Sequence, residues 1–237
     1  MDFSHIGFIG LGLIGGSIAK AIKRTAPAVS ITAYDTDRTT LSLSLNEGII
    51  DNATNEIDIT FSACDLIFLC TPVQYNEDYL LRLKSVISER CIITDAGSVK
   101  TSIHELVKKL RMEHCFIGGH PMAGSEKSGY QYSQDRLIEN AYYIITPTAG
   151  TRESDLDKMK HFVSSLGAIP IVLDYSEHDF ITASISHVPH LIASSPVSYT
   201  HLDVYKRQAL SLNTMAQPTI SSRVSPFILR AVKNAPN

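Results

Sequence analysis

Short apolar runs recur through most of the chain, separated by stretches in which apolar residues return every three or four positions. Apolar runs of about four to eight residues are typical of buried strands. Leu66–Thr71 is almost entirely apolar, as expected for a parallel strand that is buried on both faces. The strands predicted in this way are His5–Gly10, Ser30–Tyr34, Leu66–Thr71, Cys91–Asp95, Cys115–Gly119, Tyr142–Thr146 and Ile169–Leu173.

The amphipathic stretches between these runs predict helices. In Leu13–Arg24, the residues Ile14, Ile18 and Ile22 share one side of a helix. Ser102-Ile103-His104-Glu105 has the form of a capping box, which predicts the start of another helix. The predicted helices are Leu13–Arg24, Thr36–Glu47, Tyr79–Ile87, Ser102–Leu110 and a segment from Leu156 to Leu166 that ends at Gly167.

This alternation of strands and helices predicts an α/β fold with a doubly wound, mostly parallel Rossmann-type sheet. We assign it to residues 1–174. From Glu177 to about Ser195 the pattern becomes helical, so residues 175–196 are expected to begin an all-α C-terminal domain. Residues 197–237 fit neither pattern and are treated as an anomalous tail.

Composition narrows the class of protein. A net charge of −3 over 237 residues shows no excess of basic residues of the kind that binds nucleic acid. The first residues lack the basic start of a signal peptide, and the apolar run Ile6–Ala19 is too short to span a bilayer. The four cysteines form no C-x-x-C pair, which favours reduced thiols. We therefore expect a cytoplasmic protein that binds neither nucleic acid nor membrane.

A glycine motif links the first predicted strand to the first predicted helix, Gly10-Leu11-Gly12-Leu13-Ile14-Gly15. Gly10 would allow the tight turn, Gly12 would let a pyrophosphate approach the backbone, and Gly15 would let strand and helix pack closely. The amides and dipole at the helix start would then hold phosphates. The motif predicts a dinucleotide site. An ordinary turn is the alternative, because glycines are also frequent in turns.

Asp35 supports this interpretation. It lies 20 residues after Gly15, at the end of the second predicted strand, where a carboxylate binds the ribose 2′-hydroxyl and repels a 2′-phosphate. NAD is therefore favoured over NADP, although Arg38 could partly offset the carboxylate. Asp35 could also cap the helix that follows. The predicted cofactor site comprises Gly10, Gly12, Leu13, Ile14, Gly15, Asp35, Thr71 and Pro72.

Two histidine segments carry the candidate chemistry. His120 directly follows the predicted strand Cys115–Gly119 and opens the stretch His120-Pro121-Met122-Ala123-Gly124-Ser125-Glu126. A histidine beside a nicotinamide indicates hydride chemistry at a carbon that bears a hydroxyl. His187 and His190 are three positions apart on a predicted helix, which Pro189 should bend. No third ligand with zinc spacing accompanies them, so a metal site is not expected.

Taken together, these segments resemble prephenate dehydrogenases, which oxidatively decarboxylate prephenate or the related arogenate on the route to tyrosine. The matching segments are Gly10–Gly16, Asp35, Asp95–Lys100, Gly119–Glu126 with Ser128-Gly129, and Ser186–His190. The resemblance implies NAD as cofactor, a small-molecule substrate, and a homodimer formed through the helical domain. It also implies that residues 175–196 begin the substrate and dimerisation domain.

The resemblance also implies roles for single residues. His120 matches the catalytic histidine that hydrogen-bonds the ring hydroxyl, and Ser98 matches a serine that contacts both this histidine and the cofactor. Glu126, Ser186, His187 and His190 match substrate-binding positions, with His190 the better candidate for a substrate carboxylate. A structural role for His120, a helix cap at Ser98 and a solvated Glu126 are the alternatives. Four further histidines are treated as surface or helix residues without chemical context: His104, His114, His161 and His178.

The resemblance stops after Ser195, where relatives would supply a substrate-binding arginine. Val197–Gln208 looks like an adapter-derived string of translated assembled sequence, which favours an artefact over a genuine divergent tail. Because the substrate half is then a fragment, we expect the chain as written to bind NAD but to turn over slowly. Three alternatives stay open: an arogenate dehydrogenase, another NAD(P)-linked hydroxy-acid dehydrogenase, and a non-catalytic NAD-binding module.

Overall fold

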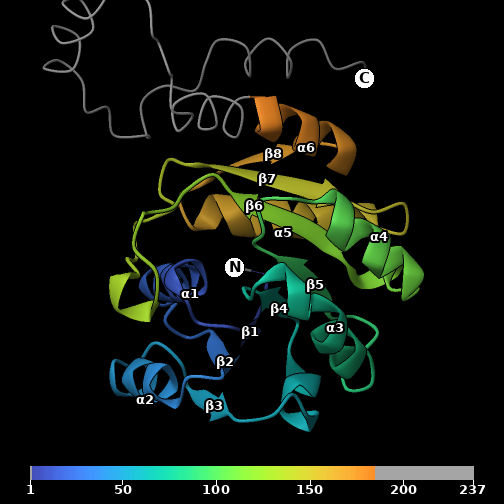
Figure 1. The fold of residues 1–237 in the computed structure, drawn as a ribbon. Coiled ribbons are helices and arrows are strands. Elements are labelled where there is room, and N and C mark those ends of the chain that lie inside the picture. Colours follow the sequence, from blue (N-terminus) through green and yellow to red (C-terminus); the bar gives the residue numbers. More distant parts are fainter. Residues whose placement is uncertain (1, 185–237) are drawn as a thin grey trace, which may run out of the picture. The chain divides into compact units, whose positions relative to one another are not determined.

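The computed structural model describes residues 2–184, drawn in colour in Figure 1. His187, His190 and Ser186, three of the predicted substrate residues, lie outside these residues, as do the anomalous tail and most of the predicted helical domain. The strands are β1 His5–Ile9, β2 Ser30–Tyr34, β3 Asn52–Thr54, β4 Leu66–Leu69, β5 Ile92–Asp95, β6 Ile117–Pro121, β7 Tyr142–Pro147 and β8 Ile169–Val172. The α-helices are α1 Leu13–Thr25, α2 Arg38–Asn46, α3 Asn76–Lys84, α4 Thr101–Lys109, α5 Glu153–Ser165 and α6 Tyr175–Thr182.

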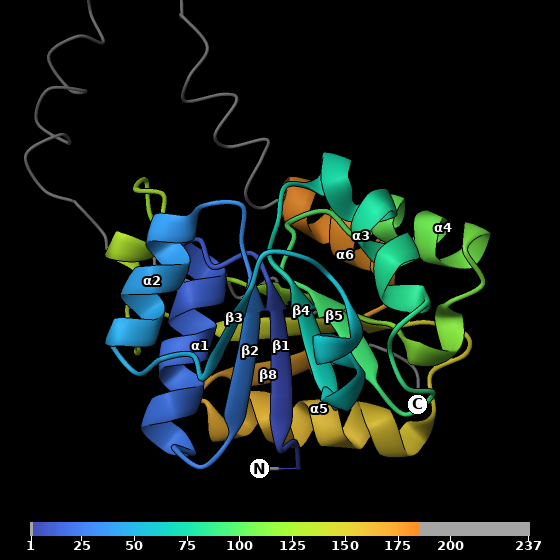
Figure 2. The same cartoon turned by 90° about the horizontal axis from the view of Figure 1, so that it is seen from below.

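The strands form two sheets. The first is a five-stranded, fully parallel sheet in the order β3-β2-β1-β4-β5. In Figure 2 its strands run side by side, with α1 and α2 next to β2 and β3, and α3 and α4 beyond β5. The second sheet has the order β6-β7-β8, with β7 antiparallel to β6 and parallel to β8. The predicted Rossmann-type fold is therefore confirmed, and the second sheet adds the antiparallel pair.

The two sheets meet at a single isolated bridge between Ile93 and Phe116, at the N-terminal side of β6. Beyond this bridge, the junction between β5 and β6 is made by side chains. This irregular junction is important because it lies directly beside His120.

The core lies on both faces of the parallel sheet, as a doubly wound fold requires. One apolar cluster packs α1 and α5 on the sheet, where the rings of Phe8 and Phe68 stack with centroids 5.1 Å apart and Phe68 contacts Phe162 of α5 at 5.8 Å. The other cluster packs α3 and α4 on the opposite face, with Leu80 and Val107 fully buried. All four residues of β4 are buried, in agreement with its uninterrupted apolar sequence.

The ends of three helices differ from the sequence prediction. Helix α2 begins at Arg38, not Thr36, because Asp37 accepts a hydrogen bond from the amide of Thr39 at 2.9 Å and caps the helix. Helix α3 begins at Asn76 rather than Tyr79. The capping box at Ser102 was wrong, because α4 begins at Thr101 and its first amides are bound by a side chain from α6.

The four cysteines are free thiols, as predicted. Cys64, Cys91 and Cys115 are buried, whereas Cys70 is half-buried at the end of β4. Burial raises the pKa of the Cys64 thiol to about 12 and that of Cys115 to about 11. These thiols are therefore protonated at neutral pH and pack as small apolar groups.

Candidate functional site

The glycine turn, Gly10–Gly15, connects β1 to α1. Gly10 has φ +94°, a conformation that side chains with a Cβ avoid. A Cβ on Gly15 would lie 2.4 Å from the carbonyl oxygen of Gly10 and 3.0 Å from Cβ of Cys70. The turn and the first helical residues therefore pack tightly against each other and against the end of β4.

Gly12 differs from the other two glycines of the motif. A Cβ on Gly12 would meet no atom within 4 Å, so the space in front of this residue is open. Gly12 is the N-cap of α1, and no side chain of the described residues caps this helix end. The first turn of α1 also has no acidic residue. Open space beside uncapped amides at the positive end of a helix dipole fits a pyrophosphate, and the half-buried Leu13 and Ile14 lie beside it.

Asp35 follows β2 and lies against the glycine turn. Its carboxylate accepts a hydrogen bond from the amide of Leu11 at 2.7 Å and another from the amide of Asp37 at 2.8 Å. Asp35 is half-buried and does not cap α2, a function that Asp37 performs, so the helix-cap alternative for Asp35 was wrong. Arg38 is exposed at the start of α2. The structure thus joins Asp35 to the glycine turn by a direct hydrogen bond.

Thr71 and Pro72 follow β4, the strand next to β1. The methyl group of Thr71 lies 2.9 Å from where a Cβ on Gly10 would be, and Pro72 is exposed. The order of strands reverses between β1 and β4, and open α/β sheets bind ligands at such a switch point, outside the carboxyl ends of the strands. The predicted cofactor residues therefore lie together where this fold places its ligands.

His120 is the fourth residue of β6, where it pairs with Ile144 of β7, and its exposed fraction is 9%. The preceding peptide is held on both sides: the amide of Gly119 donates to Asp95 at 3.1 Å, and its carbonyl accepts from the ammonium group of Lys100 at 2.7 Å. Lys100 also forms an ion pair with Asp95, and both side chains are buried. This ion pair replaces the missing strand ladder between β5 and β6.

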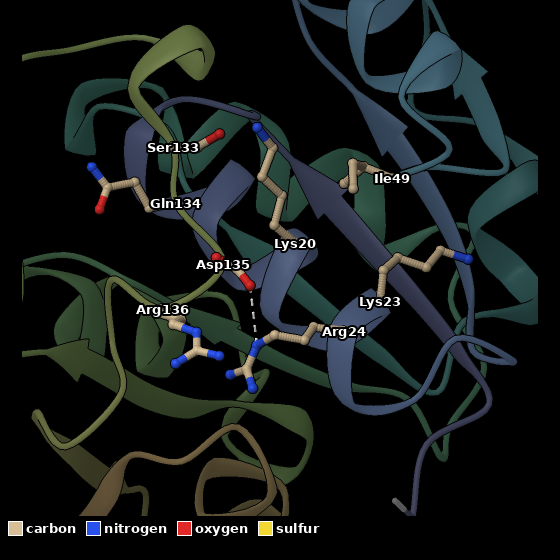
Figure 3. A pocket seen from close by; sticks show the side chains of 8 residues that line it. All are labelled: Lys20, Lys23, Arg24, Ile49, Ser133, Gln134, Asp135 and Arg136. Atoms are coloured by element: carbon tan, nitrogen blue, oxygen red, sulfur yellow. Dashed lines mark ion pairs between the residues drawn. The ribbon is translucent and has the colours of Figure 1, made fainter.

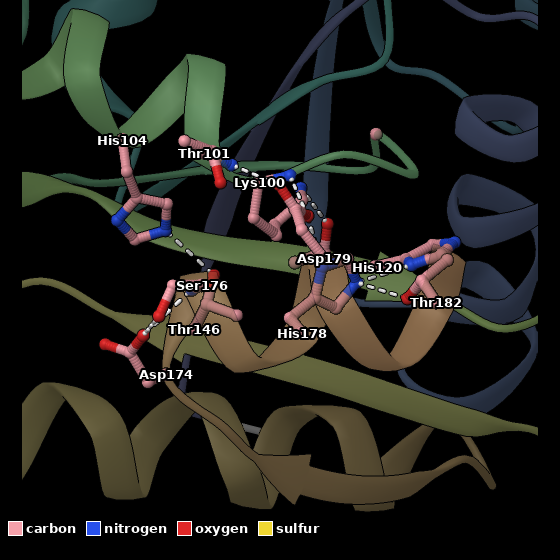
Figure 4. A network of polar contacts seen from close by, with 12 residues as sticks. Lys100, Thr101, His104, His120, Thr146, Asp174, Ser176, His178, Asp179 and Thr182 are labelled. Atoms are coloured by element: carbon pink, nitrogen blue, oxygen red, sulfur yellow. Dashed lines mark hydrogen bonds and ion pairs between the residues drawn. The ribbon is translucent and has the colours of Figure 1, made fainter. Parts of the chain in front are cut away.

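A histidine from α6 contacts His120. Nδ1 of His120 lies 2.8 Å from Nε2 of His178, and Nδ1 of His178 lies 2.8 Å from Oδ1 of Asp179 (Figure 4). On its other side, Asp179 accepts the amides of Lys100 and Thr101 at 2.7 and 2.8 Å, which caps α4. We call the row of side chains His120, His178 and Asp179 the histidine relay.

The relay corrects the interpretation of His178, which we had treated as a histidine without chemical context. The side chain of His178 is fully buried, and burial lowers its pKa below the ordinary value. Sequence spacing alone could not find this contact, because His120 and His178 are 58 residues apart. The adjacent Asp179 was the one available signal, since a carboxylate beside a histidine often orients its ring.

His104 was also treated as a histidine without context, yet it is buried. Nε2 of His104 lies 2.9 Å from Oγ1 of Thr146, and its ring stacks on Tyr175 of α6 with centroids 4.5 Å apart. Burial lowers the pKa of His104 to about 4. His104 therefore helps to pack α4 and α6 on the second sheet as a neutral side chain.

The structure places the other two predicted residues on the surface. Ser98 is exposed in the loop between β5 and α4 and, among the described residues, makes no hydrogen bond to His120. It does not cap α4, so that alternative for Ser98 was wrong. Glu126 is exposed in the loop that follows β6, as expected for a solvated carboxylate.

A hollow of about 630 Å³ lies far along α1 from the glycine turn and contains none of the predicted residues (Figure 3). The basic side chains that line it are each paired with a carboxylate: Lys20 with Glu47 at 3.2 Å, Lys23 with Asp51 at 2.8 Å, Arg24 with Asp135 at 3.3 Å and Arg136 with Glu139 at 3.8 Å. We therefore do not assign it a ligand. Within residues 2–184, no group of three acidic, histidine or cysteine side chains is arranged to hold a metal, and no helix is long and apolar enough to cross a membrane.

Comparison with known proteins identifies the family. The family model for the prephenate dehydrogenase, nucleotide-binding domain matches residues 18–172. Over 194 residues the chain is 37% identical to the prephenate dehydrogenase of Bacillus subtilis (strain 168), an alignment that covers 81% of this chain and 52% of that protein. The chain thus spans about half the length of the curated relatives it matches.

Solved structures give the same result. The prephenate dehydrogenase from A. aeolicus in complex with hydroxyphenyl propionate and NAD+ is similar with a TM-score of 0.76 and 28% identity, over 100% of this chain and 80% of that one. The arogenate dehydrogenase of Synechocystis is similar with a TM-score of 0.73 and 28% identity, over 96% of this chain and 82% of that one. The chain belongs to the prephenate dehydrogenase family, whose nucleotide-binding domain it contains over residues 18–172.

Proposed function

We propose that this chain carries out, as part of a prephenate dehydrogenase, the NAD-dependent oxidative decarboxylation of prephenate to 4-hydroxyphenylpyruvate. The observation that carries the proposal is the combination of an open glycine turn with a buried histidine in one domain. A module that only bound a nucleotide would need the glycine turn and Asp35 but would have no use for His120. Arogenate is the second candidate substrate, because an arogenate dehydrogenase shares the fold with 28% identity.

The residues around the glycine turn fit NAD. Gly12 leaves room for the pyrophosphate, the first amides of α1 would bind its oxygens, and Asp35 would accept a ribose hydroxyl. The same carboxylate would repel the 2′-phosphate of NADP. When bound, NAD supplies the acceptor for the hydride that leaves the substrate ring.

His120 would act on the ring hydroxyl of the substrate. As the carbon that bears this hydroxyl is oxidised, the imidazole would polarise or accept the hydroxyl proton and return it to the phenolic product. The ring carboxylate leaves as CO2, and the electrons of the broken carbon–carbon bond complete the aromatic ring. Aromatisation provides driving force, so the protein mainly has to position the substrate and stabilise the transferred proton.

The remaining predicted residues would complete the substrate site. Ser98 would bridge His120 and the cofactor, and Glu126, with Ser186, His187 and His190 from the helical segment, would bind the substrate carboxylates and side chain. In the native enzyme the helical domain would also form a homodimer. Residues 175–196 would begin that domain, and the protein would act in the cytoplasm.

The test is a single-turnover assay with the chain in excess over prephenate, followed by NADH absorbance and product analysis. We expect the unaltered chain to form NADH and 4-hydroxyphenylpyruvate in equal amounts. The variant His120→Asn should lose a factor of about 10²–10⁴ in rate, the usual contribution of a positioned acid or base. Its dissociation constant for NAD should not change. NAD binding without conversion of prephenate or arogenate would instead favour a nucleotide-binding module.

A further inference from the structure

The tautomer of His120 is determined by its neighbours. A neutral imidazole has one N–H donor and one lone-pair nitrogen, and the partner of the first nitrogen decides the role of the second. Nδ1 of His120 faces Nε2 of His178, so the protonation of His178 is the first question.

The carboxylate of Asp179 fixes the proton on His178. Asp179 accepts the amide N–H groups of Lys100 and Thr101 at 2.7 and 2.8 Å. Although burial opposes ionisation, these hydrogen bonds lower the pKa of Asp179 to about 2. An ionised carboxylate only accepts hydrogen bonds, so Nδ1 of His178, 2.8 Å from Oδ1 of Asp179, carries a proton.

His178 then has a lone pair on Nε2, because its neutral form is favoured. Its side chain is fully buried, and burial lowers its pKa, an effect that the charge of Lys100 reinforces. Asp179 and Asp95 are the carboxylates that act in the opposite direction, and Asp95 is already paired with Lys100. The hydroxyl of Thr182, 3.4 Å from Nε2, can donate to the same lone pair.

Two nitrogen lone pairs would repel each other at 2.8 Å, so Nδ1 of His120 has to carry the proton that points at Nε2 of His178. We infer that His178 and Asp179 are positioning residues that hold His120 as the Nδ1–H tautomer, with the lone pair on Nε2 serving as the base of the dehydrogenase reaction. The catalytic role of Nε2 in this inference rests on the proposed function, whereas the tautomer of His120 does not. When Nε2 takes the substrate proton, the new imidazolium donates Nδ1–H to His178, whose own N–H is already bound to the carboxylate.

The three elements that meet at the relay make this arrangement rigid. His120 is held in β6 by the peptide of Gly119, which is bound by Asp95 and Lys100. His178 and Asp179 are adjacent on α6, and Asp179 is fixed to the first amides of α4 (Figure 4). Because each partner is held from a second side, the relay can set a tautomer without rearrangement.

Nitrogen-15 NMR of the full chain labelled on histidine tests the tautomer directly, in the presence of NAD. His120→Asn and His178→Leu identify the two sets of ring signals. We expect both histidines to carry the proton on Nδ1 in the unaltered chain at pH 8. A proton on Nε2 of His120 would overturn the inference, whatever the turnover, so this result is separate from the test of the proposed function.

Two variants of His178 separate positioning from packing. His178→Leu removes the acceptor, and His120 should then show a mixture of tautomers. In His178→Gln the amide oxygen can still accept from Nδ1–H, so the original tautomer should be restored. NAD affinity serves as the control for folding and should stay within about twofold, because neither variant touches the glycine turn. Identical His120 signals in the unaltered and leucine forms would overturn the inference. If the leucine form does not fold, the NMR spectrum of the unaltered chain still determines the tautomer of His120.

Kinetics give a second readout. His178→Leu should lower kcat by up to about tenfold with little change in KM, because substrate contacts remain while only part of His120 keeps the lone pair on Nε2. The acid limb of the kcat/KM profile should shift to lower pH, since the imidazolium loses its stabilising partner. His178→Gln should recover part of the rate. A uniform loss in all forms with an unchanged pH profile would indicate a purely structural role and would contradict the inference.

Discussion

The glycine turn is built from the main chain of one short stretch, whereas the histidine relay is built from side chains that come from β6 and α6. The turn functions through backbone amides and open space, with Gly12 free of neighbours within 4 Å. The relay consists of polar side chains, of which His120 and His178 are buried and Asp179 is half-buried, and it is joined to the first amides of α4. Under the proposed function, a ligand would meet open space beside backbone amides at one end and a fixed histidine at the other.

This difference indicates which substitutions should disrupt each part. Atoms of the glycine turn are close in sequence, so a single added methyl group acts on the turn alone. The relay depends on contacts across the sheet junction, so a substitution at Lys100 or Asp95 should act on the fold as well as on the chemistry. The predictions below test this contrast.

The largest effect is expected at the buried ion pair. Lys100→Met would leave Asp95 buried without its cation and would remove the donor to the carbonyl of Gly119. We expect unfolding free energy to fall by about 3–5 kcal/mol in urea titrations. Lys109→Met is the matched control, because the Lys109–Glu77 pair is exposed and should contribute little. Equal losses in both variants would show that the junction does not depend on this pair.

The next effect is a pH dependence at His104. Burial lowers the pKa of His104 from 6.5 to about 4, so the unfolded chain binds a proton first as the pH falls. The stabilisation is therefore complete above pH 6.5 and is lost between about pH 6.5 and 4, by about 3 kcal/mol. His104→Gln should flatten this part of the curve of melting temperature against pH. The exposed His114→Gln should leave the curve unchanged, and an equal flattening there would refute the assignment.

Within the glycine turn, two substitutions should separate packing from binding. Gly15→Ala places a methyl group 2.4 Å from the carbonyl oxygen of Gly10 and should cost about 1–3 kcal/mol in unfolding free energy. Gly12→Ala should leave stability nearly unchanged but raise the dissociation constant for NAD, because its methyl group enters the open space. Calorimetric titration and thermal unfolding measure both. If Gly12→Ala binds NAD normally, the pyrophosphate does not lie there.

The smallest effect concerns cofactor choice. Asp35→Asn keeps an oxygen that can accept from the amide of Leu11 but removes the negative charge. We expect the preference for NAD over NADP to fall about tenfold, equivalent to about 1.4 kcal/mol of binding free energy. Competitive binding of the two cofactors measures this ratio. A ratio that does not change would mean that the carboxylate serves the glycine turn alone.

Much of the fold could be predicted because its signals are local. The glycine motif, the apolar run at β4 and the periodicity of α1 each lie within a short window, and each appears in the structure nearly as predicted. The short strand β3 was not predicted, since Asn52–Thr54 has no apolar run.

The parts that could not be predicted depend on tertiary contacts. No local pattern reveals that Asp179 caps α4 from 78 residues away, so the sequence favoured a capping box at Ser102. In the same way, His178 looks like an ordinary helical residue until α6 packs against β6. The roles of Ser98 and Glu126 stay predictions, because both side chains are exposed.

The cap that Asp179 places on α4 has a consequence for exchanging parts between relatives. The predicted boundary at residue 174 would separate α6 from the sheets, although α6 belongs to the same compact unit. A chimera joined at that boundary would pair α4 and His120 with a foreign acid and a foreign histidine. Recombination between members of the family should therefore succeed more often when the crossover follows α6, so that the nucleotide-binding half carries its own histidine relay.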